Sequence, residues 1–532
     1  MATRKEKFNF TIQRFRGFLA TFARTKRGVA GVAILIIFAL IALLAPVLAP
    51  HDPVKERFVG GYQAKPEWYD KLFPADPQSH NFIMMTNPGF NNPESLSDFN
   101  ITKTSNLIVT YHNPTLGKDA PGSLAVEYKC PSTTPAGVQS VNITKEFYYP
   151  HQRPLAQISF YAQFYVDGST YMKENKVLLD VPVNISLIIY RVVNETTKIP
   201  TDIFRYNQLI HPYELPLIGT SLNARRTVTE PTTTWIPNPV SRIDSNNLRG
   251  PIFGTDITID VTNDTLNQPA NYIYSVELVF LDTEPRKSSA QTTVYVDDLS
   301  LKGLGTAYGL FGTDRQGRDI YSQLIYGTQI SLLVGLASAG ISVVIGLIVG
   351  MIAGYSGGTI DELIMRITDA LLVIPNLPLL LVLVAVLGPN LWNLILVIGV
   401  LGWMGFARVI RSVILSLKER PFIEAAKAVG AGNVHIMLIH ILPNIMALVY
   451  VTLAMTVPSA IVAEAALSWL GLFDPTVMSW GRILYDVQQG LNIDKWWWVV
   501  PPGLLISIVA LSFIFIGHAL DEILNPKLRQ RR

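Results

Sequence analysis

Six apolar stretches, each about as long as a membrane-spanning helix, constrain the fold of this chain more than any other feature. A helix that crosses a bilayer needs about 20 predominantly apolar residues. Stretches of about that length cover residues 29–50, 330–352, 367–387, 391–410, 436–467 and 501–520. Only 16% of the residues are charged, against about 25% in an average soluble domain. The sequence therefore predicts an α-helical polytopic membrane protein with six transmembrane helices. We expect a cytoplasmic turn at residues 361–366, and kinks at Pro375 and Pro378 in the third span, because proline removes a helix hydrogen bond.

Basic residues predict which ends of the spans face the cell interior. Eight Lys or Arg residues precede the first span, and Glu6 is the only acidic residue among them. Because cytoplasmic segments carry an excess of Lys and Arg, we expect residues 1–28 and 521–532 in the cytoplasm and residues 51–329 outside the cell. The alternative for the first stretch is a secretory signal peptide. Its length exceeds the roughly 7–15 apolar residues of such a signal, so we expect a retained anchor.

The segment between the first two spans is polar and contains no apolar stretch of spanning length. Short β-rich runs alternate there with clusters of Gly, Pro, Asn and Asp, a pattern typical of a β-sandwich. The runs are 106–111, 123–128, 157–166, 183–193, 257–261, 272–281 and 292–301. We expect residues 54–303 to form an inserted all-β sandwich, followed by an external pre-span segment at 304–329 and a five-helix core at 330–520. The single cysteine, Cys130, excludes an intrachain disulfide.

Five Asn-x-Ser/Thr sequons in the predicted insert are candidate glycosylation sites. They begin at Asn100, Asn142, Asn184, Asn194 and Asn263. Chance also produces sequons, and Asn9 begins one in the predicted cytoplasmic N-terminus. Five in one outer segment fit a glycosylated surface domain.

A short helix is predicted between the fourth and fifth spans, at residues 421–430. Pro421 suits the first helical position, because its missing N–H would have no partner there, and Gly430 suits the end of the helix. Glu424 near the start and Lys427 near the end both favour the helix dipole. Such a helix is about 14 Å long, too short to cross a bilayer. Its alanines leave a surface that another protein can approach closely.

Two groups of residues resemble motifs of the permeases of ABC importers. The set Glu424, Ala425, Ala426, Gly430, Ala431, Leu442 and Pro443 resembles the motif of the cytoplasmic coupling helix, which in that family docks into a cleft on an ATPase subunit. The set Gly312, Thr313, Asp314, Gly317, Arg318 and Asp319, together with residues 49–53, resembles the dipeptide, oligopeptide and nickel branch of the family. In ordinary members these last two motifs lie close together, whereas here the β-rich segment separates them. The alternative for Arg318 and Asp319 is an ion pair that caps a helix.

The resemblance implies the type I ABC importer permease fold and a transport function without enzyme activity. It implies three kinds of protein partner: a second permease subunit in a heterodimer, two ATP-binding subunits, and an extracellular substrate-binding protein. The chain has no Gly-x-x-x-x-Gly-Lys-Ser/Thr loop, so ATP and Mg would bind to the partner ATPases. We therefore expect no cofactor, metal site or catalytic residue in this chain. The implied cargo is peptides or oligosaccharides, and the net charge of +3 gives no argument for a nucleic-acid partner.

Parts of the β-rich segment resemble carbohydrate-binding jelly-roll modules. The resemblance rests on residues 86–91, 122–126 and 294–301. Asn91 stands where that family often has an acidic residue, which argues against a structural calcium ion near Asp297 and Asp298. Two roles stay open for the insert: sugar binding, with Trp68 and Trp235 as the tryptophans available for stacking, and an inert spacer.

Two acidic residues in apolar stretches, Glu464 and Asp369, are candidates for the translocation path. Ionisable groups at membrane depth are costly, and they usually face a partner or a water-filled path. The alternative for Glu464 is a hydrogen bond that packs helices together. The alternative for Asp369 is a contact with lipid headgroups or Arg366.

Two functions other than ABC import remain as alternatives. A membrane-anchored extracellular carbohydrate-binding protein would use the spans only as an anchor, so it would not co-purify with ATPases. A secondary transporter or channel would need more charge within the membrane for ion coupling, and it would give the cytoplasmic helix no role.

Overall fold

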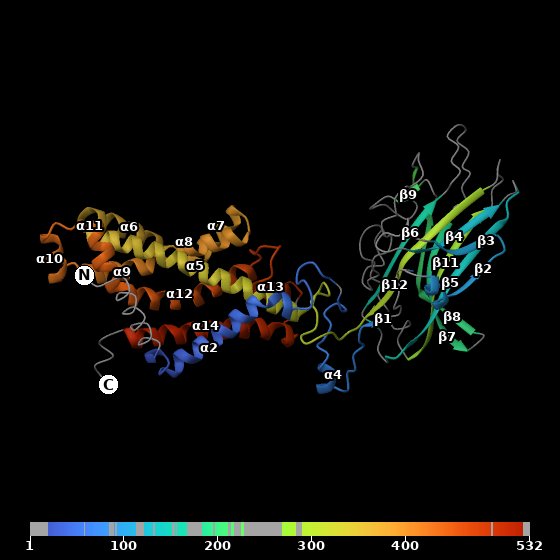
Figure 1. Cartoon of the computed structure of the whole chain (residues 1–532), viewed down its shortest axis with the longest axis horizontal. Coiled ribbons are helices and arrows are strands. Elements are labelled where there is room, and N and C mark those ends of the chain that lie inside the picture. The colour runs from blue at the N-terminus through green and yellow to red at the C-terminus, as the bar shows by residue number, and fades with distance from the viewer. Residues whose placement is uncertain are drawn as a thin grey trace, which may run out of the picture. The chain divides into compact units, whose positions relative to one another are not determined.

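We describe the protein from a computed structural model of the whole chain. The described residues are 20–57, 59–83, 90, 93–112, 122–130, 134–151, 155, 157–167, 183–194, 197–210, 214–216, 225–227, 269–282, 290–490 and 493–524. The chain forms two compact units. Residues 1–57 and 318–532 form the helical unit, and residues 58–317 form the β unit (Figure 1).

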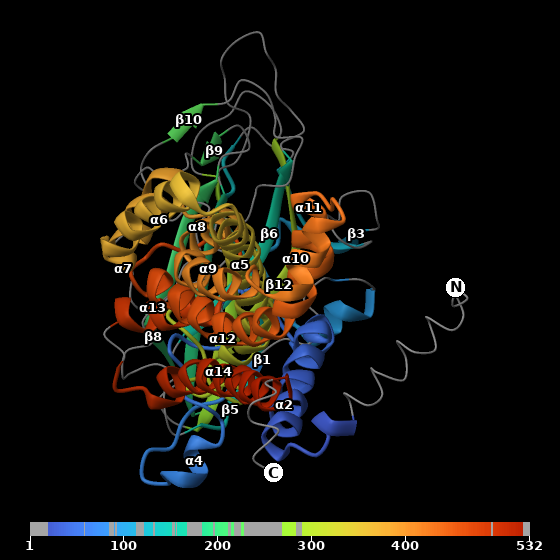
Figure 2. The same cartoon turned by 90° about the vertical axis from the view of Figure 1, so that its left-hand side faces the viewer.

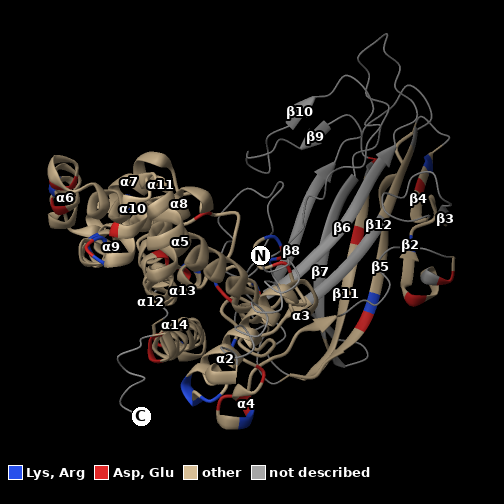
Figure 3. Ribbon diagram, turned by 60° about the vertical axis from the view of Figure 1, so that its left-hand side comes forward, with Lys and Arg blue, Asp and Glu red and all other residues tan. Residues whose placement is uncertain are grey.

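Long apolar helices make up the helical unit, and Figure 3 shows them mostly free of charge. Among the described residues, five helices are long and apolar enough to cross a membrane, and a bent pair gives a sixth span if it is counted as one. These spans consist of α2 (Lys26–Leu43), α5 (Ile320–Ser356), α6 (Gly358–Val373), α7 (Asn376–Leu387), α8 (Leu391–Leu401), α9 (Met404–Leu417), α12 (Leu442–Trp469) and α14 (Trp496–Leu524). The shorter elements are α3 (Ala45–Leu48), α10 (Pro421–Ala428), α11 (Asn433–His435), the π-helix η2 (Ile436–Ile441) and α13 (Trp480–Gln489). Six predicted spans agree with this arrangement.

The third predicted span is a broken helix rather than a kinked one. Helices α6 and α7 meet at an angle of 90°. Pro375, with φ −57° and ψ 121°, lies at the break. A proline lacks the N–H that would continue α6. Pro378, where a kink was also predicted, lies in the first turn of α7, where a proline is tolerated.

Two predicted boundaries differ from the structure. Helix α5 begins at Ile320, ten residues before the predicted start of the second span at residue 330. The side chain of Asp319 caps this helix by accepting the N–H groups of Tyr321 and Ser322, and the polar first turn hides the helix from a hydropathy search. The predicted cytoplasmic turn at 361–366 lies inside α6. The chain turns instead at Gly357, where φ is +63°.

Helix α5 packs against α8, α9 and α12 in the helical unit (Figure 2). Its small residues allow the close approach that tightly packed membrane helices need. A Cβ atom on Gly350 would lie 2.6 Å from the carbonyl oxygen of Ala407 and 2.7 Å from the Cβ of Ile410, both in α9. The glycine therefore fixes the spacing between α5 and α9.

The strands of the β unit form two antiparallel sheets of five strands each among the described residues. One sheet contains β1 (Phe82–Ile83), β12 (Ala290–Leu304), β4 (Ser123–Cys130) and β3 (Leu107–His112) in this order, and β6 (Gln157–Asp167) also pairs with β12. The other sheet has the order β2 (Asn100–Lys103), β5 (Gly137–Tyr149), β11 (Ala270–Asp282), β7 (Val183–Asn194) and β8 (Thr197–Ile210). The remaining elements are α4 (Tyr69–Leu72), the 3-10 helix η1 (Pro93–Asp98), and the strand pair β9 (Glu214–Pro216) and β10 (Arg225–Thr227).

The two large sheets pack face to face. The rings of Tyr128 in β4 and Phe280 in β11 stack with their centroids 5.6 Å apart, and both side chains are fully buried. Six of the seven predicted β-rich runs correspond to β3, β4, β6, β7, β11 and β12, and the seventh, 257–261, lies outside the described residues. The two long strands β5 and β8, and the short strands β1, β2, β9 and β10, were not predicted. Most of the 86–91 stretch that resembled a jelly-roll strand also lies outside the described residues, as does Trp235.

Candidate functional site

Helix α10 is where the sequence predicts it, with an end two residues earlier. It runs from Pro421 to Ala428, after the extended N-cap residue Arg420. Gly430 has a φ of +84°, a conformation that ends helices and that L side chains rarely adopt. The Ala431 N–H donates to the carbonyl of Ala426 at 3.1 Å, which closes the helix end.

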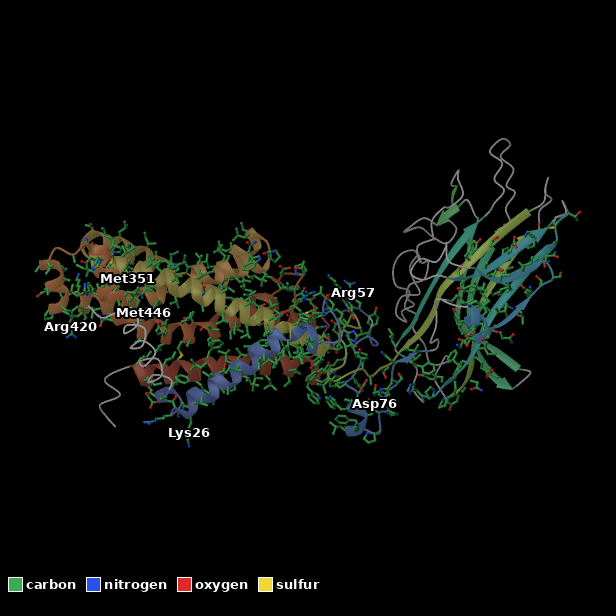
Figure 4. The ribbon with its side chains drawn as sticks, viewed as in Figure 1. Lys26, Arg57, Asp76, Met351, Arg420 and Met446 are labelled. Atoms are coloured by element: carbon green, nitrogen blue, oxygen red, sulfur yellow. The ribbon has the colours of Figure 1, made fainter. Side chains whose placement is uncertain are left out.

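One face of α10 is held by the helical unit and the rest is open to solvent. Ile423 is fully buried, and it belongs to an apolar cluster with Ile414 of α9 and Ile445 of α12. Glu424 and Ala425 are exposed, whereas Ala426 is half-buried. Figure 4 shows Arg420, next to α10, at the same end of the helical unit as Met351 and Met446. The exposed face of α10 is therefore small, and the helix is anchored to the helical unit through Ile423.

The remaining residues of the coupling motif lie at the start of α12. Leu442 packs against the cluster around Ile423, and Pro443 is exposed. They follow the π-helix η2, a rare element that often occurs at functional sites. The rings of His435 and His440, which flank this stretch, lie 5.8 Å apart. No group of three or more metal-ligating side chains occurs in the described part of the chain.

A second contact ties this region to α5. The hydroxyl of Tyr355, near the end of α5, lies 3.1 Å from Oδ1 of Asn433 in α11. Lys427 of α10 lies over the Tyr355 ring, with Nζ 5.8 Å from the ring centroid. Helix α10 is thus connected both to the core and to the long central helix.

A cavity of about 540 Å³ lies within the helical unit. It is bordered by the break between α6 and α7, by the break between α8 and α9, and by α5 and α12. Its polar side chains come from Ser342, Asn376, Thr456 and Ser459, and none of the described residues that line it is charged. The cavity was not predicted from the sequence. The prolines and glycines at the two helix breaks are the residues that could have indicated it.

Two ion pairs join α6 to α9. The Arg411 Nη2 atom lies 2.6 Å from the Asp361 carboxylate, and the Arg408 Nε atom lies 3.1 Å from that of Asp369. Asp369 does not line the cavity. It pairs with Arg408, and Arg366 pairs with Glu362 instead. The pairing proposed between Asp369 and Arg366 was therefore wrong, because α9 supplies a closer guanidinium.

Glu464 is buried at the contact between α12 and α13, and it does not line the cavity either. Its Oε1 accepts hydrogen bonds from the hydroxyls of Ser468 and Ser479, both at 2.7 Å. Ser479 is the N-cap residue of α13. These hydrogen bonds are those of the helix-packing alternative for Glu464, and its place in the translocation path stays a prediction.

The loop between α12 and α13 also holds α8. The Asp474 carboxylate accepts the N–H of Leu391, the first residue of α8, at 3.0 Å and the N–H of Thr476 at 2.8 Å. Burial acts to raise the pKa of Asp474, but its hydrogen bonds from Thr476 and Leu391 and the charge of Arg482 outweigh burial and hold this pKa below its ordinary value. A charged Asp474 thus fixes one end of α8.

Residues of the motif at 312–317 form hydrogen bonds with residues 59–64 in a connecting segment of the β unit. The Thr313 hydroxyl donates to the carbonyl of Gly61 and accepts the N–H of Ala64 at 2.9 Å. The Asp314 carbonyl accepts the N–H of Gln63 at 2.9 Å. Gly312 has a φ of +75°, and a Cβ there would lie 2.0 Å from the carbonyl oxygen of Ala64. Gly317 accepts an N–H from residue 59. These residues therefore shape the backbone.

The last two residues of the motif act on different helices. Asp319 caps α5, as described above, whereas Arg318 donates from Nη2 to Asp486 of α13 at 2.8 Å. The Arg318 side chain is only 4% exposed. Arg318 therefore pairs with α13, a helix that was not predicted, and not with Asp319 as the alternative interpretation had it. The signal for α13 was the apolar spacing of Trp480, Ile483 and Val487.

The sequons differ in accessibility. Asn100 is exposed at the start of β2, and Asn142 is half-buried in β5. Asn184 and Asn194 lie in β7, where side chains are not described, and Asn263 lies outside the described residues. Trp68, one of the two tryptophans considered for sugar stacking, is half-buried and donates from Nε1 to the Leu310 carbonyl.

Comparison with known proteins places most of the helical unit in one family. The sequence profile described as "Binding-protein-dependent transport system inner membrane component" matches residues 346–530. The profile described as "N-terminal TM domain of oligopeptide transport permease C" matches residues 13–66.

Among solved structures, the MetNI methionine ABC transporter in an inward-facing conformation is similar, with 22% identity and a TM-score of 0.33 over 39% of this chain and 97% of that chain. A carbohydrate-binding module of the β-sandwich superfamily is similar with 10% identity and a TM-score of 0.22, over 41% of this chain and 61% of that chain.

Curated relatives are considerably closer in sequence. The oligopeptide transport system permease protein OppC of Haemophilus influenzae is 40% identical over 223 residues, which are 42% of this chain and 71% of the relative. The dipeptide transport system permease protein DppC of Bacillus subtilis is 39% identical over 221 residues, which are 41% of this chain and 69% of the relative. This chain therefore belongs to the family of binding-protein-dependent transport system inner membrane components and is a multi-pass permease subunit of an ABC importer.

Proposed function

We propose that this permease subunit moves peptides into the cell and is driven by an ATP-binding partner that docks on α10. The printed names of its curated relatives refer to dipeptide and oligopeptide transport, which supports peptides as the cargo. The observation that carries the coupling proposal is α10 itself, a short helix held by one buried isoleucine, Ile423, with the flanking Glu424 and Ala425 open to solvent. ATP and Mg bind to the partner ATPases, and this chain supplies the mechanical connection.

Movement of α10 would reach the spans through the cluster around Ile423. That cluster includes Ile410 and Ile414 of α9 and Ile445 of α12. Because protein interiors are close-packed, a displaced side chain transmits strain to its neighbours. When the ATP-binding subunits close, α10 would push on α9 and α12 together, and these helices border the cavity.

We propose the cavity as part of the translocation path in place of Glu464 and Asp369. Its hydroxyl and amide groups, from Ser342, Asn376, Thr456 and Ser459, can donate to and accept from peptide amides. The lack of charge among its described lining residues suits cargo of varied side chains, because no fixed charge selects against either sign. The helix breaks at Pro375 and Gly402 are two places at which the helices that line the cavity can bend.

The distribution of charge supports the proposed orientation. Lys26 and Arg420 lie toward one end of the helical unit and Arg57 toward the other (Figure 4). By the positive-inside rule, the end with Lys26, Arg420 and α10 is cytoplasmic. Residues 51–329 are then extracellular, where a substrate-binding protein would deliver cargo to a heterodimer of this chain and a second permease subunit.

Charge reversal on α10 tests the coupling proposal. Glu424→Arg opposes the helix dipole at its N-terminal end and adds bulk to the docking face. We expect substrate-stimulated ATP hydrolysis of the purified importer to fall about tenfold or more, the effect of losing about 1.4 kcal/mol of contact free energy. Glu362→Arg, at an exposed position of α6, is the matched control and should leave the rate unchanged. Full stimulation in Glu424→Arg would refute the assignment of α10.

The cargo is tested separately with the intact importer in proteoliposomes. We expect ATP-dependent accumulation of a labelled oligopeptide and none of a labelled oligosaccharide. Accumulation of the oligosaccharide alone would overturn the peptide proposal and leave the coupling proposal untouched.

A further inference from the structure

An exposed aromatic surface lies on α4 and the residues beside it. We call the side chains of Trp68, Tyr69, Leu72, Phe73 and Leu310 the α4 patch. Leu72 is 63% exposed, Leu310 52% and Phe73 44%. The rings of Tyr69 and Phe73 lie 4.5 Å apart, and Trp68 Nε1 donates to the Leu310 carbonyl at 2.7 Å. These contacts join Tyr69 to Phe73 and Trp68 to the backbone at Leu310, and the apolar side chains of Leu72, Phe73 and Leu310 remain exposed.

Polar contacts hold the other side of α4, so the patch cannot turn inward. Asp70 accepts the N–H of Gln78 at 3.0 Å, and its second carboxylate oxygen lies 3.3 Å from Nε2 of His80. With 3.6 residues per turn, the patch residues of this short helix share one side, and Asp70 lies on the other. The sequence of α4 therefore directs its large apolar side chains outward.

The composition of the patch matches a membrane interface. Trp and Tyr concentrate at the headgroup level of bilayers, where one end of the ring is apolar and the other is hydrated. Basic residues beside an apolar surface strengthen contact with lipid phosphates. Lys71 is exposed next to the patch. Lys65 lies over the Tyr69 ring, with Nζ 4.1 Å from its centroid, and it is ion-paired with Asp76.

The covalent chain keeps the patch within reach of the membrane. Val47, in α3 at the end of the first span, is 81% exposed, as expected of a side chain that faces lipid. Twenty residues separate Leu48 from Trp68. Leu310 lies nine residues before Asp319, the N-cap of α5, and nine residues span at most about 30 Å. The connection from Leu310 to α5 is therefore short.

We propose that the α4 patch inserts into the headgroup interface of the bilayer and anchors the β unit at the membrane surface. The lipid surface is the partner, and the anchor restricts where the β unit can move relative to the membrane. This proposal does not rest on the peptide cargo or on the docking of an ATPase to α10.

Site-directed spin labelling of the full chain in vesicles tests the proposal. Cys130→Ser removes the single cysteine, which is buried, and gives a background for one new label. Leu72→Cys places the label in the patch. Val138→Cys, at a 56% exposed position of β5, is the matched control. The vesicles contain phosphatidylcholine and phosphatidylglycerol, and the label's collision rates are measured with oxygen, which concentrates in lipid, and with a water-soluble nickel chelate.

The expected result is a several-fold higher ratio of oxygen to chelate collisions at position 72 than at position 138. A ratio at position 72 equal to the control would overturn the proposal, because the patch would then face water. Low collision rates with both reagents at position 72 would also overturn it, since a protein partner would then cover the patch.

Discussion

In the helical unit, the position of a buried charged residue is explained by the side chain with which it pairs or forms hydrogen bonds. Glu464 was a candidate for the translocation path, but its carboxylate accepts two serine hydroxyls between α12 and α13. The alternative interpretation of Arg318 was an ion pair within its own motif, but Arg318 pairs with Asp486 on α13. In both cases a buried polar group needs a partner because leaving it unpaired is costly, and α13 supplies the partner.

At this scale we predict that Glu464 stabilises the helix contact and takes no part in transport. Glu464→Ala leaves the hydroxyls of Ser468 and Ser479 without their acceptor, so it should lower the free energy of unfolding by about 1–3 kcal/mol. Glu464→Gln keeps an oxygen acceptor and should cost less. Thermal unfolding of the purified chain measures both. A Gln variant of normal stability that fails to transport would contradict the prediction and restore a role in the path.

Elements of the helical unit depart from regular helix where function is proposed. The corner between α6 and α7, the break between α8 and α9, and the π-helix η2 lie at the cavity or next to α10. Elsewhere, α5 runs unbroken for 37 residues and packs closely on α9. The long helix thus provides a rigid support, and the interrupted helices provide the places that can bend.

The rigidity of α5 is tested by adding one methyl group at two of its glycines. Gly350→Ala would place Cβ 2.6 Å from the Ala407 carbonyl oxygen, so α5 and α9 must separate, at a cost of about 1–3 kcal/mol typical of overpacking. A Cβ at Gly340, in the same helix, would meet nothing within 4 Å, so Gly340→Ala should be neutral or slightly stabilising. Melting temperatures of the two purified variants decide the matter. Equal values would show that the contact yields easily.

The whole molecule combines a permease with a large inserted sheet structure. The insertion occurs in a connecting segment whose two sides are hydrogen bonded to each other, from Val59 and Gly317 to the strand pair of β1 and β12. Ile83 and Lys302 are directly paired in this ladder. The sheets therefore extend from a closed base, and the chain enters and leaves them at one place.

At the scale of the molecule we predict that the helical unit folds without the sheets. Deleting residues 84–301 and joining Ile83 to Lys302 through Asn-Gly, which favours a two-residue hairpin turn, should preserve assembly with the partner subunits and the basal ATP hydrolysis rate. Co-purification and the hydrolysis rate measure this. Removing residues 59–316 instead also destroys the base, so it serves as the comparison. Loss of assembly in the shorter deletion would contradict the prediction.

Most of the secondary structure followed from local patterns. Apolar length predicted the spans, and β-rich runs between Gly, Pro, Asn and Asp predicted six of the described strands. Pro421 and Gly430 predicted the limits of α10 to within two residues. The missed β5 carries the alternation Val141, Asn142, Ile143, Thr144, with the two apolar residues fully buried, so its signal was present in the sequence.

The sequence by itself determined the membrane class, the spans, the β-rich insert and α10, because hydropathy, turn residues and helix ends act over a few neighbouring residues. Only the tertiary structure decided the cavity, the partner of Arg318, the hydrogen-bond partners of Glu464 and the 90° angle between α6 and α7. Each of these depends on side chains that are distant in the chain or on the direction in which a helix resumes after a break. The physical reason is that packing selects contacts by shape and by the need to pair buried polar groups, and no local pattern records which distant residue meets that need.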